Sequence, residues 1–253
     1  MTAAKTQQAL GSIRAFLLDL DGVITPTAEV HERAWADLFT RVFEEHGAAP
    51  YTDADYFSYL DGKPRFVGVR DALASRGIAL PEGMPGDDPE FDTVCGLGNR
   101  KNAIFARLLD EEGVTAYPGS LELVAEADAL GIETAVVTSS RNGHRVLRAA
   151  GLEGRFETIV DGVRAAELEL PGKPAPDTYL QGARELDLPA SACAVVEDAL
   201  SGVAAGAAGG FGLVIGVDRG AGADELLEAG ADIVVADLAD LVRPLREARS
   251  SAG

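Results

Sequence analysis

The sequence predicts an α/β fold: a doubly wound parallel sheet into which a helical domain is inserted near the start. After Gly131, short apolar runs alternate with amphipathic stretches of helical length, a pattern typical of parallel strands joined by right-handed helical crossovers. The apolar run Phe16–Leu18 is predicted to be one more buried strand. Between these regions, residues 29–111 show helical periodicity and contain no convincing buried strand.

The predicted sheet region contains five short apolar runs and five helical segments in alternation. Gly151 and Gly230 each follow one of these helices, and glycine is a common residue at helix ends. We expect strands at residues 132–137, 158–160, 193–196, 213–217 and 233–235, and helices at 142–150, 177–186, 199–208, 223–229 and 238–248.

The inserted region carries one apolar stripe at helical spacing, formed by Trp35, Leu38, Phe39, Val42 and Phe43. Residues 81–89, rich in proline, glycine and acids, are predicted to be a surface loop of this region. We therefore divide the chain into a core domain, residues 1–28 and 112–253, and a helical cap domain, residues 29–111.

Composition limits the partners that this protein can have. The 253 residues carry a net charge of −19, which disfavours nucleic acid or an anionic membrane as the main partner. A phosphorylated substrate would need local cations or a metal to offset that charge. The only two cysteines, Cys95 and Cys193, show no metal-ligand spacing and are expected to be reduced and buried. We expect a cytoplasmic monomer with no membrane-spanning segment and no signal peptide.

The first candidate site follows the strand Phe16–Leu18, where Asp19 and Asp21 are spaced i, i+2 and are followed by Gly22. If the chain stays extended, the two carboxylates lie on one face at the carboxyl end of a strand, where open α/β sheets bind ligands. The alternative is a simple turn, since aspartate and glycine are common turn residues.

Two further segments carry groups that bind anions. Thr138, Ser139 and Ser140 end a predicted strand, and Arg141 and Asn142 open the next helix. Hydroxyls beside free helix N–H groups can hold a phosphate, although Thr138 or Ser139 could simply cap the helix. Lys173 lies in a proline-bracketed loop, which would aim its ammonium at an anion; a surface lysine is the alternative.

A fourth segment adds acids, because the predicted strand at residues 193–196 ends in Glu197 and Asp198. Either could cap the following helix. Together with Asp19 and Asp21, they would place four acids in one crevice, which is unfavourable unless a cation lies among them. Oxygen ligands at strand ends are suited to Mg²⁺.

These four segments, in this order, resemble the haloacid dehalogenase superfamily of aspartate-based phosphotransferases. The resemblance implies that Asp19 is the nucleophile and Asp21 the general acid/base. It also implies that Thr138 and Lys173 bind the transferring phosphoryl group. Asp19, Asp21, Glu197 and Asp198 would form the Mg²⁺ site. Ser139, Ser140, Arg141 and Asn142 are assigned to substrate binding beside Thr138.

The inserted region narrows the resemblance to the β-phosphoglucomutases. The matching segments are TAEVHERAW at residues 27–35, DGKPR at 61–65, NRKN at 99–102 and YPG at 117–119. By this resemblance, Thr27, His31, Gly62, Arg65 and Lys101 contact the substrate, with Arg65 at the distal phosphate. From the residues alone, His31 would be an ordinary polar side chain facing solvent. Residues 77–98 and 163–171 are longer than their counterparts in the family.

The expected function is therefore Mg²⁺-dependent interconversion of β-glucose 1-phosphate and glucose 6-phosphate through an aspartyl phosphate. Hydrolysis of a small sugar phosphate is the alternative within the same chemistry, because only the cap decides whether water or a sugar hydroxyl accepts the phosphoryl group. A non-catalytic phosphate-binding regulatory module is the alternative from another class. That alternative predicts a missing nucleophile, acid/base or lysine, and none is missing here.

Overall fold

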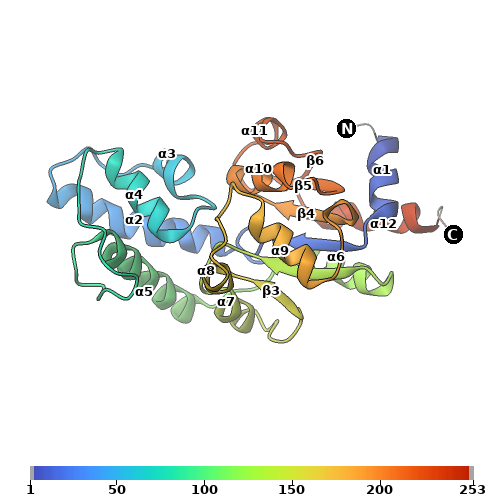
Figure 1. The fold of residues 1–253 in the computed structure, drawn as a ribbon, viewed down its shortest axis with the longest axis horizontal. Coiled ribbons are helices and arrows are strands. Elements are labelled where there is room, and N and C mark those ends of the chain that lie inside the picture. Colours follow the sequence, from blue (N-terminus) through green and yellow to red (C-terminus); the bar gives the residue numbers. More distant parts are fainter. Residues whose placement is uncertain (1–2, 251–253) are drawn as a thin grey trace. The chain divides into compact units, whose positions relative to one another are not determined.

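The computed structural model describes residues 3–250, with side chains from residue 6 onward (Figure 1). The chain forms two compact units. The core unit contains the residues up to Pro26 and those from Thr115 onward, and the inserted unit contains Thr27–Val114. The sequence-based division lies close by, at residues 28/29 and 111/112.

A six-stranded parallel sheet forms the centre of the core unit, with the order β3-β2-β1-β4-β5-β6. The predicted fold class is confirmed, and each predicted strand is present. Five of the six strands have buried residues facing the interior, as expected where helices cover both faces of a parallel sheet. The strands are β1 (Ala15–Leu18), β2 (Glu133–Val137), β3 (Thr158–Val160), β4 (Cys193–Glu197), β5 (Leu213–Val217) and β6 (Ile233–Val235).

The register of the central strands brings the predicted motifs to one edge of the sheet. Leu18, the last residue of β1, is paired with Val136 of β2 and with Val196 of β4. Because the three strands are parallel, the residues that follow them emerge side by side. The Asp19–Asp21 segment, Thr138 and Glu197 therefore share the carboxyl edge of the sheet.

Helices cover the sheet on both faces, as the right-handed crossovers require. Helices α9 and α10 contact each other and the central strands, while α1, α6 and α12 form a second group of packed helices (Figure 1). The predicted helices are present as α7 (Gly143–Ala149), α9 (Asp177–Glu185), α10 (Leu200–Ala208), α11 (Ala223–Glu228) and α12 (Ala239–Ser250). In the described part of the core unit, three further α-helices were not predicted, α1 (Ala3–Ser12), α6 (Pro118–Ala129) and α8 (Gly162–Glu167), nor was the short 3-10 helix η2 (Ala190–Ala192).

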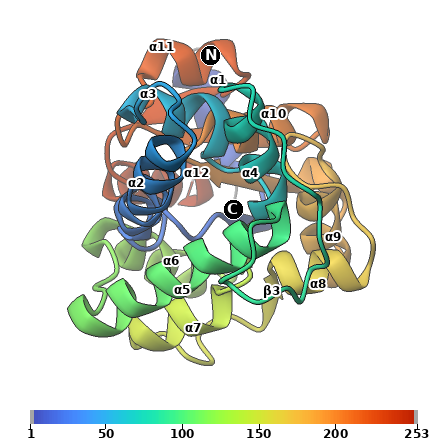
Figure 2. The ribbon, with the colours of Figure 1, turned by 90° about the vertical axis from the view of Figure 1, so that its left-hand side faces the viewer.

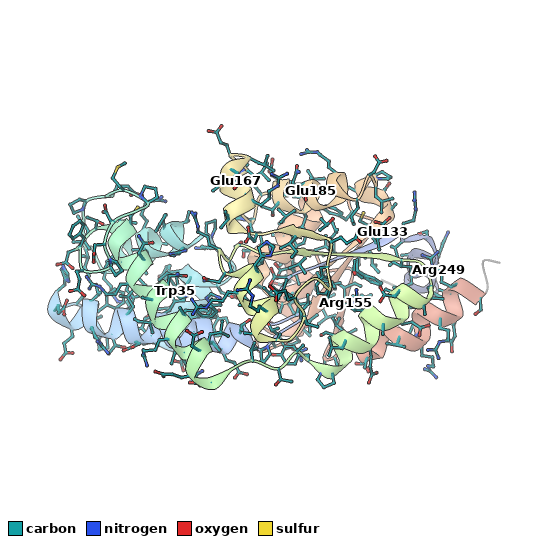
Figure 3. The ribbon with its side chains drawn as sticks, turned by 90° about the horizontal axis from the view of Figure 1, so that it is seen from below. Trp35, Glu133, Arg155, Glu167, Glu185 and Arg249 are labelled. Atoms are coloured by element: carbon teal, nitrogen blue, oxygen red, sulfur yellow. The ribbon has the colours of Figure 1, made fainter. Side chains whose placement is uncertain are left out.

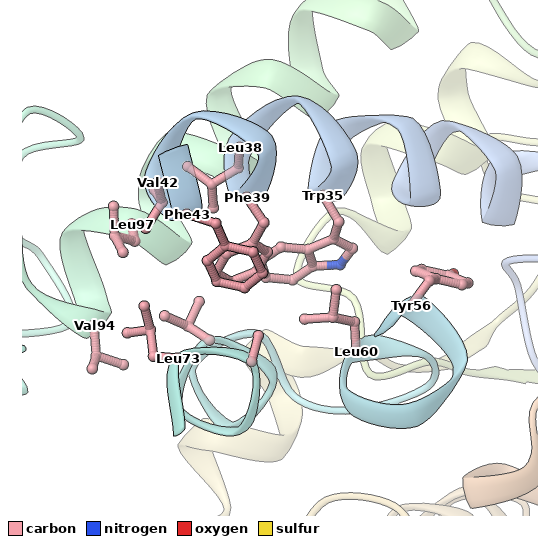
Figure 4. Close-up of a cluster of buried hydrophobic side chains, with 12 residues drawn as sticks. Trp35, Leu38, Phe39, Val42, Phe43, Tyr56, Leu60, Leu73, Val94 and Leu97 are labelled. Atoms are coloured by element: carbon pink, nitrogen blue, oxygen red, sulfur yellow. The ribbon is translucent and has the colours of Figure 1, made fainter. Parts of the chain in front are cut away.

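The inserted unit is helical in the structure, as expected. It consists of α2 (Thr27–Glu45), α3 (Asp53–Asp55), the π-helical turn η1 (Tyr56–Leu60), α4 (Arg65–Ala74) and α5 (Val94–Glu112). The predicted stripe of α2 is buried in an apolar cluster that includes Leu60, Leu73 and Leu97 from the other elements (Figure 4). Burial of this stripe holds α2, α4 and α5 together.

The segment between α4 and α5 is mostly irregular, as predicted for residues 81–89 (Figure 2). Thr93 ends it by capping α5, with its hydroxyl accepting a hydrogen bond from Gly96 N–H at 2.9 Å. Two side chains of α5 hold the segment in place. Asn99 donates to the carbonyls of Pro85 and Asp87, and Arg100 Nε donates to the Pro89 carbonyl.

Several acidic residues of the chain lie on its surface. Glu133, Glu167 and Glu185 of the core unit are exposed (Figure 3). Both cysteines are buried and neither forms a disulfide, as predicted. Within residues 3–250, the structure contains no helix that is both long enough and apolar enough to cross a membrane.

Candidate functional site

The centre of the candidate site is a buried ammonium between two carboxylates. Lys173 Nζ lies 2.5 Å from Asp19 Oδ1 and 2.5 Å from Glu197 Oε1. It also donates to the Val137 carbonyl at 3.2 Å. Lys173 is only 3% exposed and Asp19 only 6%, so the surface-lysine alternative is wrong. The loop before α9 delivers this ammonium to the ends of β1, β2 and β4.

Glu197 uses both of its carboxylate oxygens within the protein. Besides Lys173, its Oε1 accepts a hydrogen bond from the Tyr179 hydroxyl at 3.1 Å. Its Oε2 accepts from the N–H groups of Asp198 and Ala199, each at 2.9 Å. The N-cap residue of α10 is Ala199, so the alternative that Glu197 or Asp198 caps this helix is wrong. Glu197 instead hydrogen-bonds both Lys173 and the backbone N–H groups at the start of α10.

Gly202 makes room for the Glu197 carboxylate. A Cβ at position 202 would lie 1.7 Å from Glu197 Oε1, far inside contact distance. Glycine costs stability inside a helix, and here that cost allows a buried carboxylate to lie against the first turn of α10. Tyr179 and Gly202 are thus two residues of the site that we did not predict. The signal for Tyr179 was its position in the helix directly after the Lys173 loop.

The electrostatics of this centre keep Lys173 charged. Burial alone would lower the pKa of Lys173, but the negative charges of Asp19 and Glu197 and their hydrogen bonds raise it above its ordinary value. Burial raises the pKa of Asp19 well above its ordinary value; the Lys173 charge opposes this shift, and the charges of Glu197 and Asp21 add to it. Burial, followed by the charge of Glu197, also raises the pKa of Tyr179, so its hydroxyl remains a donor.

The donor set at this edge fits a divalent cation. Asp19, Glu197 and Asp198 each offer a carboxylate oxygen, and these atoms lie within 4.8 Å of one another. Three acids around one lysine leave excess negative charge, which a hard cation with oxygen ligands would neutralise. In the described part of the chain, this group does not include Asp21, so a metal contact from the Asp21 side chain stays a prediction.

Asp21 lies beside Thr138 in the structure. The Thr138 hydroxyl, which is 2% exposed, is 3.4 Å from Asp21 Oδ2. It also accepts a hydrogen bond from Ser140 N–H at 3.0 Å. The N-cap residue of α7 is Asn142, so the alternative that Thr138 or Ser139 caps this helix is wrong.

Gly22 lets the turn after Asp21 approach the other acidic segment. Its φ is +87°, and a Cβ there would lie 1.8 Å from Asp198 Oδ2. Any side chain at this position would therefore be both strained and in collision. The turn brings the first and the last of the four motifs together.

The remaining predicted residues of the core unit lie near the start of α7. Ser139, Ser140 and Asn142 are half-buried and Arg141 is exposed. The Ser140 hydroxyl accepts a hydrogen bond from Asn142 N–H at 3.2 Å. These side chains lie in the segment that follows β2, and their substrate contacts stay a prediction.

In the inserted unit, His31 and Lys101 are in contact. Lys101 Nζ hydrogen-bonds His31 Nδ1. The His31 ring stacks on Phe105 with ring centroids 4.0 Å apart, and Lys101 Nζ lies 4.7 Å from the centroid of the Trp35 ring. Lys101 is 4% exposed and His31 is half-buried, so the alternative of a His31 facing solvent is wrong.

Arg65 lies on the same unit, at the first position of α4. Its Nη1 donates to Asn99 Oδ1 at 3.0 Å and to the Gly98 carbonyl at 3.4 Å. Gly62 is in the turn before α4, with a φ of +64°, and Thr27 is the buried first residue of α2. The predicted substrate residues of the inserted unit thus include the pair His31 and Lys101, and Arg65, which is held by Asn99.

The fold and this site together define a class of α/β protein. Its members have a Rossmann-type parallel sheet, a carboxylate and lysine centre at the carboxyl ends of the middle strands, and a helical unit inserted after the first strand. The family model of haloacid dehalogenase-like hydrolases matches residues 13–210 of this chain.

Two known proteins of this kind are similar to the chain in sequence. A β-phosphoglucomutase of Mycobacterium bovis is 45% identical over 240 residues, covering 91% of this chain and 92% of that protein. Hexitol phosphatase A of Escherichia coli is 33% identical over 202 residues, covering 78% and 80% of the two chains.

A solved structure extends the similarity to the fold. The β-phosphoglucomutase of Clostridium difficile superposes with a TM-score of 0.76 at 25% identity, covering 95% of this chain and 98% of that one. The chain therefore belongs to the haloacid dehalogenase-like hydrolase family, in its β-phosphoglucomutase-like subfamily.

Proposed function

We propose that this protein is a Mg²⁺-dependent β-phosphoglucomutase that transfers a phosphoryl group through Asp19. The observation that carries this proposal is the buried contact of Lys173 with Asp19, at 2.5 Å, beside an acidic group suited to a divalent cation. The 45% identity to a β-phosphoglucomutase over most of both chains supports the choice of substrate.

The first chemical step forms a bond between an Asp19 oxygen and phosphorus. The bond from phosphorus to the sugar oxygen breaks, and Asp21 gives that oxygen a proton. In the second step a sugar hydroxyl attacks phosphorus, Asp21 takes the hydroxyl proton, and the bond to Asp19 breaks. Covalent catalysis divides one difficult transfer into two easier ones, and Asp21 must alternate between its two protonation states.

Countercharge for the phosphoryl oxygens comes from Lys173 and from the proposed cation. Lys173 is held in place by Glu197 and by the Val137 carbonyl, so its charge is already oriented when the transition state forms. Mg²⁺, when bound among Asp19, Glu197 and Asp198, supplies further positive charge to phosphoryl transfer. Since both oxygens of Glu197 accept hydrogen bonds from the protein, we assign it chiefly the task of orienting Lys173.

The inserted unit would recognise the sugar and its second phosphate. Arg65 is held by Asn99 on α5, and guanidinium groups bind phosphate through parallel hydrogen bonds. His31 and Lys101 form a buried polar pair on an aromatic surface, which suits a sugar hydroxyl and ring. These residues would hold the intermediate bisphosphate while it reorients.

One measurement tests this proposal directly. The protein is incubated with β-glucose 1-phosphate, Mg²⁺ and a trace of glucose 1,6-bisphosphate, and glucose 6-phosphate is quantified against inorganic phosphate. We expect glucose 6-phosphate as the main product, with no product from Asp19→Ala. Rapid release of inorganic phosphate with little isomer would contradict mutase activity.

That contrary result would favour the second candidate, a phosphatase for a small sugar phosphate. Its support is the similarity to hexitol phosphatase A. A non-catalytic regulatory module is separated from both by beryllium fluoride, a phosphate mimic. Mg²⁺-dependent binding of this mimic at Asp19 without turnover of any phosphate ester would favour such a module.

A further inference from the structure

Arg219 lies in the loop that follows β5, and no role has been assigned to it. Its neighbour Asp218 fixes this loop at both ends. The N–H of Asp218 donates to the Val235 carbonyl at 2.9 Å. Asp218 Oδ1 accepts hydrogen bonds from Gly220 N–H at 3.0 Å and Gly222 N–H at 3.1 Å. The backbone on either side of Arg219 is therefore held at defined positions, which reduces the freedom of its side chain.

The Arg219 guanidinium binds backbone groups instead of a carboxylate. Nε donates to the Gly22 carbonyl at 3.0 Å, and Nη1 donates to the Ala236 carbonyl at 3.1 Å. Its Cζ lies 3.9 Å from the centroid of the Tyr117 ring, within cation–π range. Nη2 is buried and has no hydrogen-bond partner among the residues that the structure describes. Arg219 as a whole is half-buried, and its contacts are to backbone carbonyls and an aromatic ring.

The Gly22 carbonyl belongs to a turn whose carbonyls are all held by donors of the core unit. The Val23 carbonyl accepts from the Ser120 hydroxyl at 2.6 Å. The Ile24 carbonyl accepts from Tyr117 N–H at 2.9 Å, and the Thr25 carbonyl from Gly22 N–H at 2.7 Å. Of these donors only Arg219 is charged, and hydrogen bonds from charged donors are roughly twice as strong as neutral ones.

We propose that Arg219 is a positioning residue for the proposed acid/base Asp21. The carbonyl that Arg219 holds belongs to Gly22, the residue directly after Asp21. Gly22 N–H, which belongs to the peptide unit shared with Asp21, donates to the Thr25 carbonyl at 2.7 Å, so Gly22 is held on both sides and the backbone that carries Asp21 is restrained. Arg219 also lies against Tyr117, whose N–H holds the same turn at Ile24. The guanidinium therefore fixes the turn at two points, one direct and one through the Tyr117 ring.

This role requires an arginine, not merely a positive charge. The planar guanidinium donates in two directions while its face lies on the aromatic ring. A lysine ammonium has a single nitrogen, which cannot reach both carbonyls and also cover Tyr117 with a flat face. Arg219→Lys should therefore lose most of the positioning of Asp21, although the substitution keeps the positive charge.

The inference rests on the proposed role of Asp21, and its test isolates proton transfer. Arg219→Lys and Arg219→Gln are compared with the unchanged protein on phenyl phosphate and 2,4-dinitrophenyl phosphate, with Mg²⁺. Phenoxide is a poor leaving group that needs a proton, whereas dinitrophenoxide leaves without one. General acid catalysis contributes about 10²–10⁴-fold, and a displacement of about 1 Å can cost 10²-fold.

We expect kcat/KM for phenyl phosphate to fall about 10–100-fold in both variants. For dinitrophenyl phosphate we expect a fall of less than about threefold, since no proton is needed. If kcat/KM fell equally for both esters, or fell for neither, the inference would be overturned. Arg219→Lys keeps the test valid if Arg219→Gln does not fold, and the exposed Arg243→Gln is the matched control.

The same experiment separates this inference from the proposed function. Asp19→Ala should abolish hydrolysis of both esters, and activity retained in that variant would overturn the proposed nucleophile alone. Failure to isomerise β-glucose 1-phosphate would overturn the proposed substrate. The ratio of kcat/KM for the two aryl esters would still decide the role of Arg219, because neither ester contains a sugar.

Discussion

Replacement of Glu197 by glutamine tests whether this acid serves chiefly to hold Lys173. The substitution keeps the shape of the side chain and creates no cavity, so its effect reports hydrogen bonding and charge. Glu197 accepts four hydrogen bonds, from the side chains of Lys173 and Tyr179 and from the N–H groups of Asp198 and Ala199. A glutamine amide has only one oxygen, so in either orientation its NH₂ group faces two of these donors.

The magnitude follows from burial. The Glu197 and Lys173 side chains are each 1% exposed, and removal of one partner from a buried pair costs about 3–5 kcal/mol. Asp19 still faces Lys173 at 2.5 Å, so the ammonium keeps one countercharge. The cost should therefore lie at the lower end of this energy range. We expect a loss of about 3 kcal/mol, which lowers the Tm by about 6–12 °C for a unit of this size.

The assay is thermal and guanidinium unfolding of the full chain in the presence of a chelator. Far-UV circular dichroism follows the whole chain. Fluorescence of the single tryptophan, Trp35, follows the inserted unit, which keeps the two unfolding transitions distinct. The control Glu153→Gln removes an exposed acid paired with Arg148 and should change stability by less than about 0.5 kcal/mol.

The sign of the change in Tm caused by Glu197→Gln decides between two possible roles of Glu197. If its main task were to bind a metal, its neutralisation without metal would relieve repulsion with Asp19 and Asp198 and raise the Tm. An unchanged or higher Tm in the chelator would therefore refute the hydrogen-bonding argument.

Three further predictions concern the metal, the second phosphate and acid stability. Asp198→Asn should weaken Mg²⁺ binding by at least about tenfold, measured by calorimetry, because the acidic group loses a charged ligand. Arg65→Ala should weaken binding of glucose 1,6-bisphosphate by about 10–100-fold, measured by titration, through loss of charged hydrogen bonds. Asp55→Asn should destabilise the inserted unit by about 2 kcal/mol near neutral pH, because Asp55 pairs with Arg76 at 2.6 Å. Burial acts to raise the pKa of Asp55, but the hydrogen bonds from Arg76 and Thr52 outweigh it and hold the pKa below its ordinary value. This stabilisation is therefore present above the unfolded-state pKa of about 3.9 and is lost as the pH falls through the lower folded-state pKa, which Trp35 fluorescence can follow.

Each of these predictions has an exposed counterpart on the same unit. Asp240→Asn should leave Mg²⁺ binding unchanged, and Arg70→Ala should leave bisphosphate binding unchanged. Asp71→Asn, which removes an exposed partner of Lys63, should cost less than about 1 kcal/mol. Equal effects in a variant and its counterpart would show that net charge, and not the particular contact, is responsible. If Arg65→Ala weakened turnover of small aryl phosphates as much as bisphosphate binding, Arg65 would not belong to a distal phosphate site.

The helices that the sequence did not reveal depend on tertiary packing. Helix α1 carries a weak apolar pattern, yet Leu10 is fully buried and the helix packs against α12. Helix α6 begins with Pro118 at its first turn, a start signal that was available. Its glycine and serine in that turn weaken the helical pattern, and contacts with α12 and β2 compensate.

The candidate site was only partly visible in the sequence for a similar reason. Asp19, Thr138, Lys173 and Glu197 could be identified because each follows an apolar strand or precedes a helix with a clear start. Their contacts could not be derived, since Lys173 lies 154 residues from Asp19 and 24 from Glu197. The order of the strands and the path of the Lys173 loop determine which acids the ammonium meets.

The sequence by itself determined the alternation of strands and helices, the inserted helical unit and the kinds of chemical group at the strand ends. These follow from apolar periodicity and from the residue types next to it, which are local properties of the chain. Only the tertiary structure decided how those groups share their hydrogen bonds. It placed Lys173 between two acids, occupied both oxygens of Glu197 and brought Arg219 to Gly22 across 197 residues, because side-chain contacts depend on which strands and loops become neighbours.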